Sequence, residues 1–432
     1  MLADVPMVFI LVGITAYTVL SGADFGAGLW TLIPGGGRAG VAATREHTRH
    51  AIGPVWEANH VWLIFVLTVA WTCYPVAFGS IVSTLSIPLF IAAVGIILRG
   101  ATYALRSQLE AGTRRVALVE DVFALSSVLT PFALATVIGG IATGRVPVGN
   151  ARGNLITSWL NPVSVLAGVL AVAFSGYLAA VYLAADASRL AERDLVRDFR
   201  ARGLVTGVLA GALALAGLFV VRASGPRYLW NGLTSGLGLA LVCLCALAGV
   251  VTMVLVWVGR FGLARASAAL AVAAVIAGWA AAQSPRLLPG LTVAAAAADR
   301  ATLIATIIGV AVGAVVLVPS LLLLYTLVLR GRLDVAGTPD DAGAGLAGAG
   351  LAGARPSGAR LPRARVAGVF AAGALVAGVG LLVFGGPAWV HGLGALAALA
   401  CAVIVFGLAA GPPEEPAARP AAGPTAGPPE RT

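Results

Sequence analysis

The stretch GPVWEANHVWLIFVLTVAW, residues Gly53 to Trp71, decides the fold, because polar side chains open a long apolar run. Glu57, Asn59 and His60 stand near its beginning, and the residues after them are almost wholly apolar. Pro54 suits the first turn of a helix, and an acidic residue soon after it is stabilised by the helix dipole. We therefore expect a membrane helix whose first turns carry polar groups.

The rest of the chain has the same character. Of its 432 residues, 59% are hydrophobic and only 11% are charged, and the mean hydropathy is +0.96, far above that of soluble domains. Glycine and alanine suit close helix packing in lipid, and the runs are too long for barrel strands. We predict an all-α, polytopic membrane bundle. Windows of about 20 apolar residues give spans near 7–32, 57–79, 81–104, 118–142, 162–185, 204–221, 235–258, 265–283, 302–329, 366–385 and 388–410.

These spans divide the chain into four parts. We expect a nine-helix core over residues 1–332 and a flexible, Gly/Ala/Pro-rich cytoplasmic linker over residues 333–365. A second group of two transmembrane helices follows over residues 366–410, and residues 411–432 form a Pro-rich tail that we expect to be disordered. The N-terminal segment lacks the basic start of a signal peptide, so the first helix is expected to be retained.

The positive charge of the chain is entirely arginine, and its distribution predicts the orientation. Loops that face the cytoplasm when the N-terminus lies outside hold fifteen arginines, against six in the opposite loops. The positive-inside rule therefore places the N-terminus outside and the C-terminal tail in the cytoplasm. The net charge of +10 is then a signal of topology. We expect no nucleic-acid partner.

Apart from Glu120, which directly precedes Asp121, and an arginine at the start of a later span, four acidic or arginine residues fall within or at the ends of the expected spans: Asp24, Glu57, Arg99 and Asp121. A charged side chain at mid-membrane costs about 2.5 to 3.5 kcal/mol, so such residues tend to face an interior. The predicted topology places all four in one layer near the cytoplasmic face. An excess of carboxylates in a poorly hydrated layer favours proton uptake by at least one of them. Helix-end residues neutralised by nearby arginines fit the same pattern, and the sequence leaves both readings open.

The residues that could bind a metal are scattered. His60 is the one histidine within the first nine expected spans, and a lone histidine is weak support for a haem ligand. Cys73, Cys243, Cys245 and Cys401 all fall inside apolar runs, which is typical of small packing residues. We predict neither a metal site nor a cofactor-binding site in this chain.

The segment SGADFGAGLW, residues 21–30, together with GPVWEANHVWLIF, resembles the N-terminal signature of subunit II of cytochrome bd-type quinol oxidases. Similar segments follow in order. They are ILRGATYALRS around Arg99, the Asp121 span with Pro131, NPVSVLAGV from Asn161, and TLIATIIGVAVGAVVLVPSLLLLYT over residues 302–326. The resemblance covers residues 1 to about 332 and includes the nine spans of that family.

This resemblance implies a subunit of a heterodimeric terminal oxidase in the bacterial cell membrane. Such a complex oxidises a membrane quinol, reduces O2 to water and belongs to the aerobic respiratory chain. The two b-type haems and haem d are expected in subunit I, and this chain is expected to ligate none of them. The expected partners are therefore subunit I, membrane quinol and O2. The extra C-terminal helices could contact a small accessory membrane subunit.

The resemblance also assigns roles to residues. Asp24, Glu57 and Asp121 are expected to form a proton relay on the cytoplasmic side. Glu57 stands where the family commonly has aspartate, so the acid is kept but is longer by one methylene. A structural or charge-pairing role is expected for Arg99, Trp56, Asn59 and Trp62. The family does not require histidine at the position of His60.

Two other classes of function fit the charged residues. In a proton- or ion-coupled secondary transporter, Asp24, Glu57 and Arg99 would bind the coupling ion or the substrate. Transporters favour discontinuous helices and binding near the bilayer midplane, whereas these charges are expected near one face. In a purely structural subunit, the buried charges would only dock the partner.

Overall fold

The computed structural model describes residues 2–33, 40–106 and 114–329, and the side chains of residues 49–58 lie outside the described part. The chain divides into two units, Met1–Thr326 and Leu327–Thr432, and the helices discussed below lie in the first, except for the last residues of α12. The expected linker 333–365, helix pair 366–410 and tail 411–432 lie outside the described residues and stay predictions.

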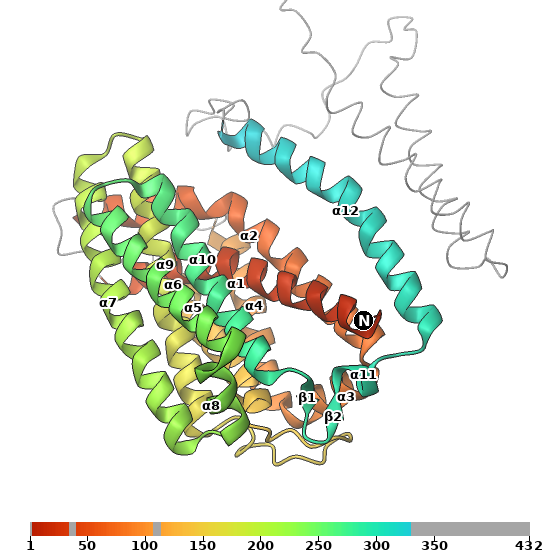
Figure 1. Ribbon diagram of the computed structural model, residues 1–432. Coiled ribbons are helices and arrows are strands. Elements are labelled where there is room, and N and C mark those ends of the chain that lie inside the picture. The colour runs from red at the N-terminus through yellow and green to blue at the C-terminus, as the bar shows by residue number, and fades with distance from the viewer. Residues whose placement is uncertain (1, 34–39, 107–113, 330–432) are drawn as a thin grey trace, which may run out of the picture. The chain divides into compact units, whose positions relative to one another are not determined.

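The described residues are almost entirely helical (Figure 1). In chain order the elements are a short 3-10 helix Leu2–Asp4, α1 Val5–Leu32, α2 Gly40–Cys73, α3 Pro75–Thr84, α4 Ser86–Arg106, α5 Arg114–Ala142, α6 Pro162–Arg189, α7 Arg193–Ser224, α8 Arg227–Thr234, α9 Gly236–Trp257, α10 Phe261–Gln283, β1 Arg286–Leu288, β2 Leu291–Thr292, α11 Val293–Ala296 and α12 Arg300–Leu329.

Seven of the described helices are long and apolar enough to cross a membrane, or eight if α3 and α4 together make one bent span. The prediction of an all-α membrane fold is confirmed, although the described residues do not reach nine full spans. The antiparallel hairpin of β1 and β2 was not expected from the sequence. It pairs Leu288 with Leu291 and buries Leu288 in the apolar core.

The expected spans 57–79 and 81–104 are divided differently in the structure. The expectation that a helix begins at Pro54 is wrong, because α2 already begins at Gly40. Helix α2 ends at Cys73, and α3 begins at Pro75 after a break at Tyr74. A second break at Leu85 bends α3 from α4 by 82°. Proline has no backbone N–H, so Pro88 cannot donate to the carbonyl of Thr84, and Pro75 favours a new helix start. A hydropathy window registers neither effect, because both segments are equally apolar.

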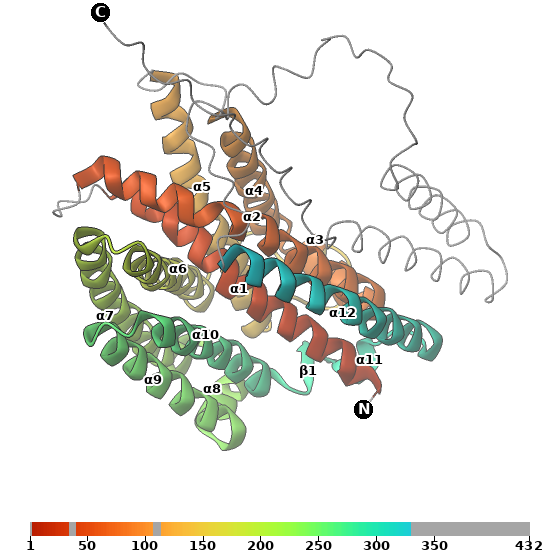
Figure 2. The same ribbon diagram turned by 90° about the horizontal axis from the view of Figure 1, so that it is seen from above.

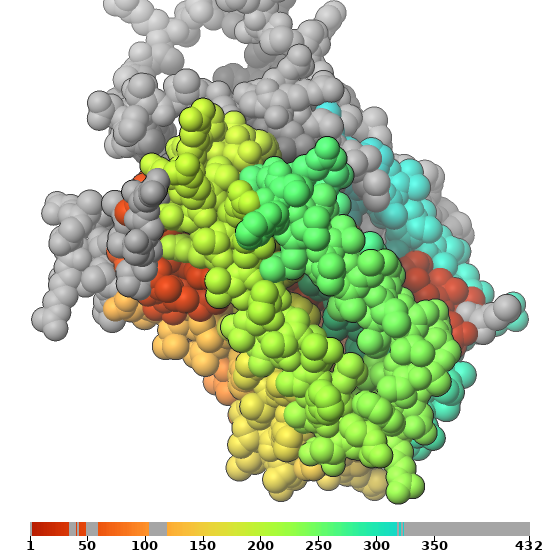
Figure 3. Space-filling view, turned by 60° about the vertical axis from the view of Figure 1, so that its left-hand side comes forward, coloured from red at the N-terminus to blue at the C-terminus, as the bar shows by residue number. Residues whose placement is uncertain are grey.

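Helices α1 and α6 form the centre of the described bundle. The α2, α4 and α5 helices lie on one side of them, and α7, α9 and α10 lie on the other (Figure 2). In Figure 3 the yellow-green and green helices from α7 onward lie on the near face of the molecule. Helices α7 and α9 keep large apolar side chains exposed, such as Phe219 and Val250. An exposed apolar face of this kind suits lipid or another membrane subunit.

The contact between α1 and α6 depends on glycine. A Cβ atom at Gly26 would lie 1.8 Å from the carbonyl oxygen of Ser175, and one at Gly22 would lie 2.8 Å from a methyl carbon of Leu178. Glycines four residues apart lie on one face of a helix and allow close approach of a neighbouring backbone. The Trp30 indole N–H then donates to the Gly176 carbonyl at 3.0 Å and fixes the register of the two helices.

Helix α12 starts from a local cap. Asp299 Oδ2 accepts hydrogen bonds from the amides of Ala301 and Thr302, and its Oδ1 accepts one from the Thr302 hydroxyl at 2.6 Å. These bonds, the one from the Thr302 hydroxyl first, lower the pKa of Asp299. The capped start of α12 therefore favours an ionised carboxylate at the positive end of the helix.

The close approach of α1 and α6 predicts an effect of adding one methyl group. Gly26→Ala places a Cβ against the Ser175 carbonyl, which is backbone and cannot turn away, so we expect a loss of stability on the order of 3 kcal/mol. The measurement is the thermal midpoint of the purified protein in detergent. Gly211→Ala on α7 is the matched control, because its Cβ would meet nothing within 4 Å. Equal midpoints for the two variants would contradict the packing argument.

Candidate functional site

A cluster of buried polar residues lies where α1, α2, α4 and α5 meet. Asp24 comes from the second half of α1, Asn59 from α2, Arg99 from α4 and Ser127 from α5. Each is at most 1% exposed, so the cluster is closed to solvent on all sides. Two of these residues come from the two N-terminal motifs that carried the family resemblance.

The central contact is an ion pair between Asp24 and Arg99. Arg99 Nη2 lies 2.5 Å from Asp24 Oδ1, and Arg99 Nε donates to Asp24 Oδ2 at 3.2 Å. Nη2 also donates to the backbone carbonyl of Asp24 at 2.8 Å. This two-pronged geometry matches a planar guanidinium to a carboxylate, the arrangement that best compensates two buried charges.

The remaining face of Arg99 is also occupied. Its Nη1 donates to the Ser127 hydroxyl oxygen, and that hydroxyl in turn donates to the Phe123 carbonyl at 2.6 Å. The guanidinium carbon lies 4.1 Å from the centre of the Phe123 ring and 5.0 Å from that of Phe25. Contacts between a cation and an aromatic ring are stronger when both are desolvated, as they are here.

Space for the guanidinium comes from Gly28, one turn after Asp24. A Cβ at this position would lie 2.1 Å from the Ser127 hydroxyl and 3.0 Å from Arg99 Nη1. The residues of the motif GADFGAG therefore make different contacts. Gly22 and Gly26 face α6. Asp24 pairs with Arg99, and Gly28 leaves room for that pair.

Asn59 extends the cluster toward α2. Its Nδ2 donates to Asp24 Oδ2 at 3.2 Å, so it helps to hold the carboxylate. Its Oδ1 is buried and accepts no hydrogen bond from any residue that the structure describes. A buried amide oxygen of this kind is open to a donor from a neighbouring acid or a water molecule.

The other predicted site residues are placed less centrally. Trp62 packs edge-on against Phe65, with ring centres 6.1 Å apart. Asp121 is exposed on α5 and is no part of the Asp24 contact. The backbone of α2 includes Trp56 and Glu57, but both side chains lie outside the described part, so their roles stay predictions.

Sequence reasoning missed several partners in this region. Ser127, Phe123 and Gly28 complete the Arg99 site, yet nothing distinguishes them from the other small and aromatic residues of apolar helices. The ion pair between Arg45 and Glu120, at 3.2 Å, was also missed. It links α2 to α5 beside the exposed Asp121, and among the described side chains of α2 the basic partner of this pair of acids is Arg45, which meets Glu120.

His47 of α2 is engaged within the fold. His47 Nε2 lies 3.1 Å from the Leu183 carbonyl, and its ring packs 5.7 Å from the ring of Phe199. Over residues 2–33, 40–106 and 114–329, no group of three His, Cys, Asp or Glu side chains could hold a metal ion. The geometry of the described cluster therefore offers charge pairing and hydrogen bonding, and the assignment of the haems to the partner subunit stays a prediction.

The chain is similar in sequence and in fold to known proteins. A family model described as cytochrome bd terminal oxidase subunit II matches residues 2–328. Cytochrome bd ubiquinol oxidase subunit 2 of Bacillus subtilis (strain 168) is 27% identical over 166 residues, which is 37% of this chain and about half (47%) of that relative. A chain of the bd oxidase from Geobacillus thermodenitrificans has the same fold, with a TM-score of 0.58 and 23% identity, over 76% of this chain and 99% of that one.

The buried pair predicts how the protein responds to loss of Arg99. Arg99→Ala leaves Asp24 buried without its cation, so we expect a loss of about 3 to 5 kcal/mol and little folded protein. The double variant Asp24→Asn/Arg99→Gln removes both charges and should recover part of the yield. The measurement is the monodisperse yield and thermal midpoint in detergent, with Arg197→Ala on the exposed side of α7 as the control. A stable Arg99→Ala protein would contradict the pairing argument.

Proposed function

Because the chain belongs to the subunit II family of cytochrome bd terminal oxidases, we propose that it is the second subunit of a heterodimeric quinol oxidase. In this proposal the complex oxidises a membrane quinol, reduces O2 to water and serves the aerobic respiratory chain of a bacterial cell. The single observation that carries the proposal is the match over residues 2–328, nearly the whole described core. The Asp24, Asn59 and Arg99 cluster, built from the signature motifs, supports it.

The redox groups belong, in this proposal, to the partner. The two b-type haems and haem d would supply the electron transfer and the O2 chemistry from subunit I. The hydrogen-bond contact of His47 Nε2 with the Leu183 carbonyl is consistent with this division. This chain then stabilises the partner, and the exposed apolar faces of its outer helices offer area for that contact and for lipid. The C-terminal helix pair would contact a small accessory subunit.

A proton path on the arginine-rich side is the chemical role that we propose for the chain itself. Asp24 is engaged by the Arg99 guanidinium at 2.5 Å. Its part is to fix the cluster and to orient Asn59. Glu57 lies half a turn before Asn59 on α2, and we assign proton uptake to it, with Asp121 at the exposed entrance. Asn59 Oδ1 supports a hydrogen-bonded link between entrance and interior.

The proposed orientation follows from the loop arginines. With the N-terminus outside, the Asp24 end of α1 faces the cytoplasm, which is the source of the protons consumed in O2 reduction. The same topology places the hairpin of β1 and β2 on the outside. A scan of single cysteines at Ala191 and Gly290, labelled in intact cells with a membrane-impermeant maleimide, tests it. We expect the reagent to label Gly290→Cys and not Ala191→Cys. Labelling of Ala191→Cys alone would show that the orientation is the opposite of the proposed one.

Purification from the native host tests the oxidase assignment. We expect the tagged chain to copurify with a larger membrane subunit, and the reduced-minus-oxidised spectrum to show b- and d-type haem bands. The reason is the family of the chain, which is that of subunit II of a haem-containing terminal oxidase. A colourless preparation without the partner would overturn the assignment and favour a secondary transporter, which liposome uptake of ions would then detect.

Replacing Glu57 tests the proton path. Glu57→Gln keeps the size and hydrogen bonding of the side chain but cannot carry a proton. We therefore expect quinol-driven O2 consumption to fall by about 10²-fold or more, as is usual when an acid–base group is lost. Haem content, read from the spectrum, should stay at the wild-type level. Glu192→Gln, at an exposed turn after α6, is the matched control. Full turnover in Glu57→Gln would reject the relay, and loss of haem would point to a structural role.

A further inference from the structure

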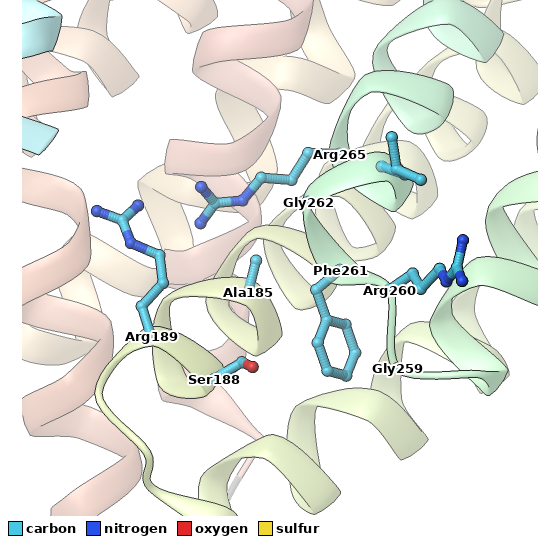
Figure 4. Close-up of a pocket in the computed structure, with 9 residues that line it drawn as sticks. Ala185, Ser188, Arg189, Gly259, Arg260, Phe261, Gly262 and Arg265 are labelled. Carbon is cyan, nitrogen blue, oxygen red and sulfur yellow. The ribbon is translucent and has the colours of Figure 1, made fainter.

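A basic cavity lies at the end of α6, where the turn between α9 and α10 meets it (Figure 4). Its volume is about 390 Å³, and its lining includes Ser188, Phe261 and three arginines, Arg189, Arg260 and Arg265. Pockets that hold small ligands span about 300 to 1,000 Å³, so the volume suits a headgroup. The cavity is separate from the Asp24 cluster and shares no residue with it.

The cavity carries a surplus of positive charge. Asp186 accepts from Arg265 at 2.5 Å and pairs more loosely with Arg189 at 3.4 Å. No carboxylate of the described residues pairs with Arg260. Three cations therefore face one anion, which leaves two positive charges uncompensated.

The three arginines differ in how firmly they are held. Arg265 also donates to the Tyr182 carbonyl at 2.8 Å, and its guanidinium lies 5.0 Å from the centre of the Tyr182 ring. The side chain of Arg189 is 49% exposed. In Figure 4 the Arg189 and Arg265 side chains extend to one side of Phe261, and Arg260 extends to the other. One arginine is thus fixed in place, and two at the rim are able to follow a ligand.

The backbone adds to the same field. Phe261, Gly262 and Leu263 form the first turn of α10 and line the cavity. Their amides have no acceptor within the helix, and Arg260 at the N-cap position provides no side-chain cap. The positive end of the α10 dipole therefore lies at the cavity that the three arginines line.

The surroundings of the cavity indicate which kind of anion binds. Large apolar side chains beside it are exposed: Leu190 is 62% exposed, Val258 58% and Leu263 57%. These residues lie at the ends of membrane helices, where the acyl chains of a lipid begin. A free phosphate makes no favourable contact with such an apolar surface. A phospholipid can contact the apolar surface with its acyl chains and the arginines with its phosphate.

We propose that this cavity binds the phosphate of an anionic phospholipid, with Arg189 and Arg260 at the rim, Arg265 at the fixed wall and the acyl chains against Leu190 and Leu263. Basic pockets between membrane helices on the cytoplasmic side are a recurring solution for anionic headgroups. The inference concerns the chain as a membrane protein and holds apart from the oxidase assignment.

Native mass spectrometry of the delipidated protein, with its copurifying subunits, tests the proposal. The probes are phosphatidylglycerol, phosphatidylcholine and inorganic phosphate. We expect the affinity for phosphatidylglycerol to be well above that for phosphatidylcholine. The double variant Arg189→Gln/Arg260→Gln should lower the affinity for phosphatidylglycerol roughly 30-fold, since each arginine near an anionic surface contributes about a fivefold factor. The matched control is Arg193→Gln/Arg197→Gln, which removes the same charge from exposed positions on α7 outside the cavity.

Three results would overturn the proposal. One is an equal loss of phosphatidylglycerol in the two double variants, which would make the effect one of net charge. Another is binding of phosphatidylcholine as strong as that of phosphatidylglycerol. The third is displacement of the lipid by inorganic phosphate at comparable concentration, which would assign the cavity to free phosphate. Equal thermal midpoints of both variants without added lipid verify that folding is unchanged.

Discussion

The buried guanidinium of Arg99 is the constraint on which the centre of this bundle depends. A fully buried cation is tolerated only when carboxylate and hydrogen-bond partners surround it, and a loss of either leaves an uncompensated charge. Those partners come from α1 and α5, so these two helices must lie together within reach of the Arg99 side chain. Gly28 makes that approach sterically possible. One short motif therefore supplies the counter-ion and the space for it.

Much of this arrangement could be predicted from the sequence. Apolar runs of the length of a bilayer, an asymmetry of arginines and the 1.5 Å rise per residue of a helix place Asp24 and Arg99 in one layer. The partners of Arg99 could not be predicted in the same way. Ser127 and Phe123 resemble many other residues of apolar helices, and which of them faces Arg99 depends on the rotation of α5. Composition does not encode that rotation.

The helix breaks around α3 and the different surroundings of Glu120 and Asp121 were missed for a similar reason. Pro75 and Pro88 indicate the interruptions around α3, but a hydropathy window averages over them, since their neighbours are apolar. Glu120 and Asp121 are adjacent, yet successive residues of a helix point about 100° apart, so only the first meets Arg45. Counting charges in a segment predicts their depth in the membrane. It does not predict their direction.

The arginines connect the fold of the chain to its function. The positive-inside rule counts all of them alike, but their surroundings divide them into two groups. Arg200 donates to the Trp257 carbonyl, and Arg202 lies over the rings of Trp30 and Phe199, so both are engaged within the fold. Arg260 has no carboxylate partner in the described residues and borders a cavity. An arginine that the rule counts is thus either engaged by hydrogen bonds and aromatic rings within the fold, or available to an anion. Only the geometry of the folded chain distinguishes these two cases.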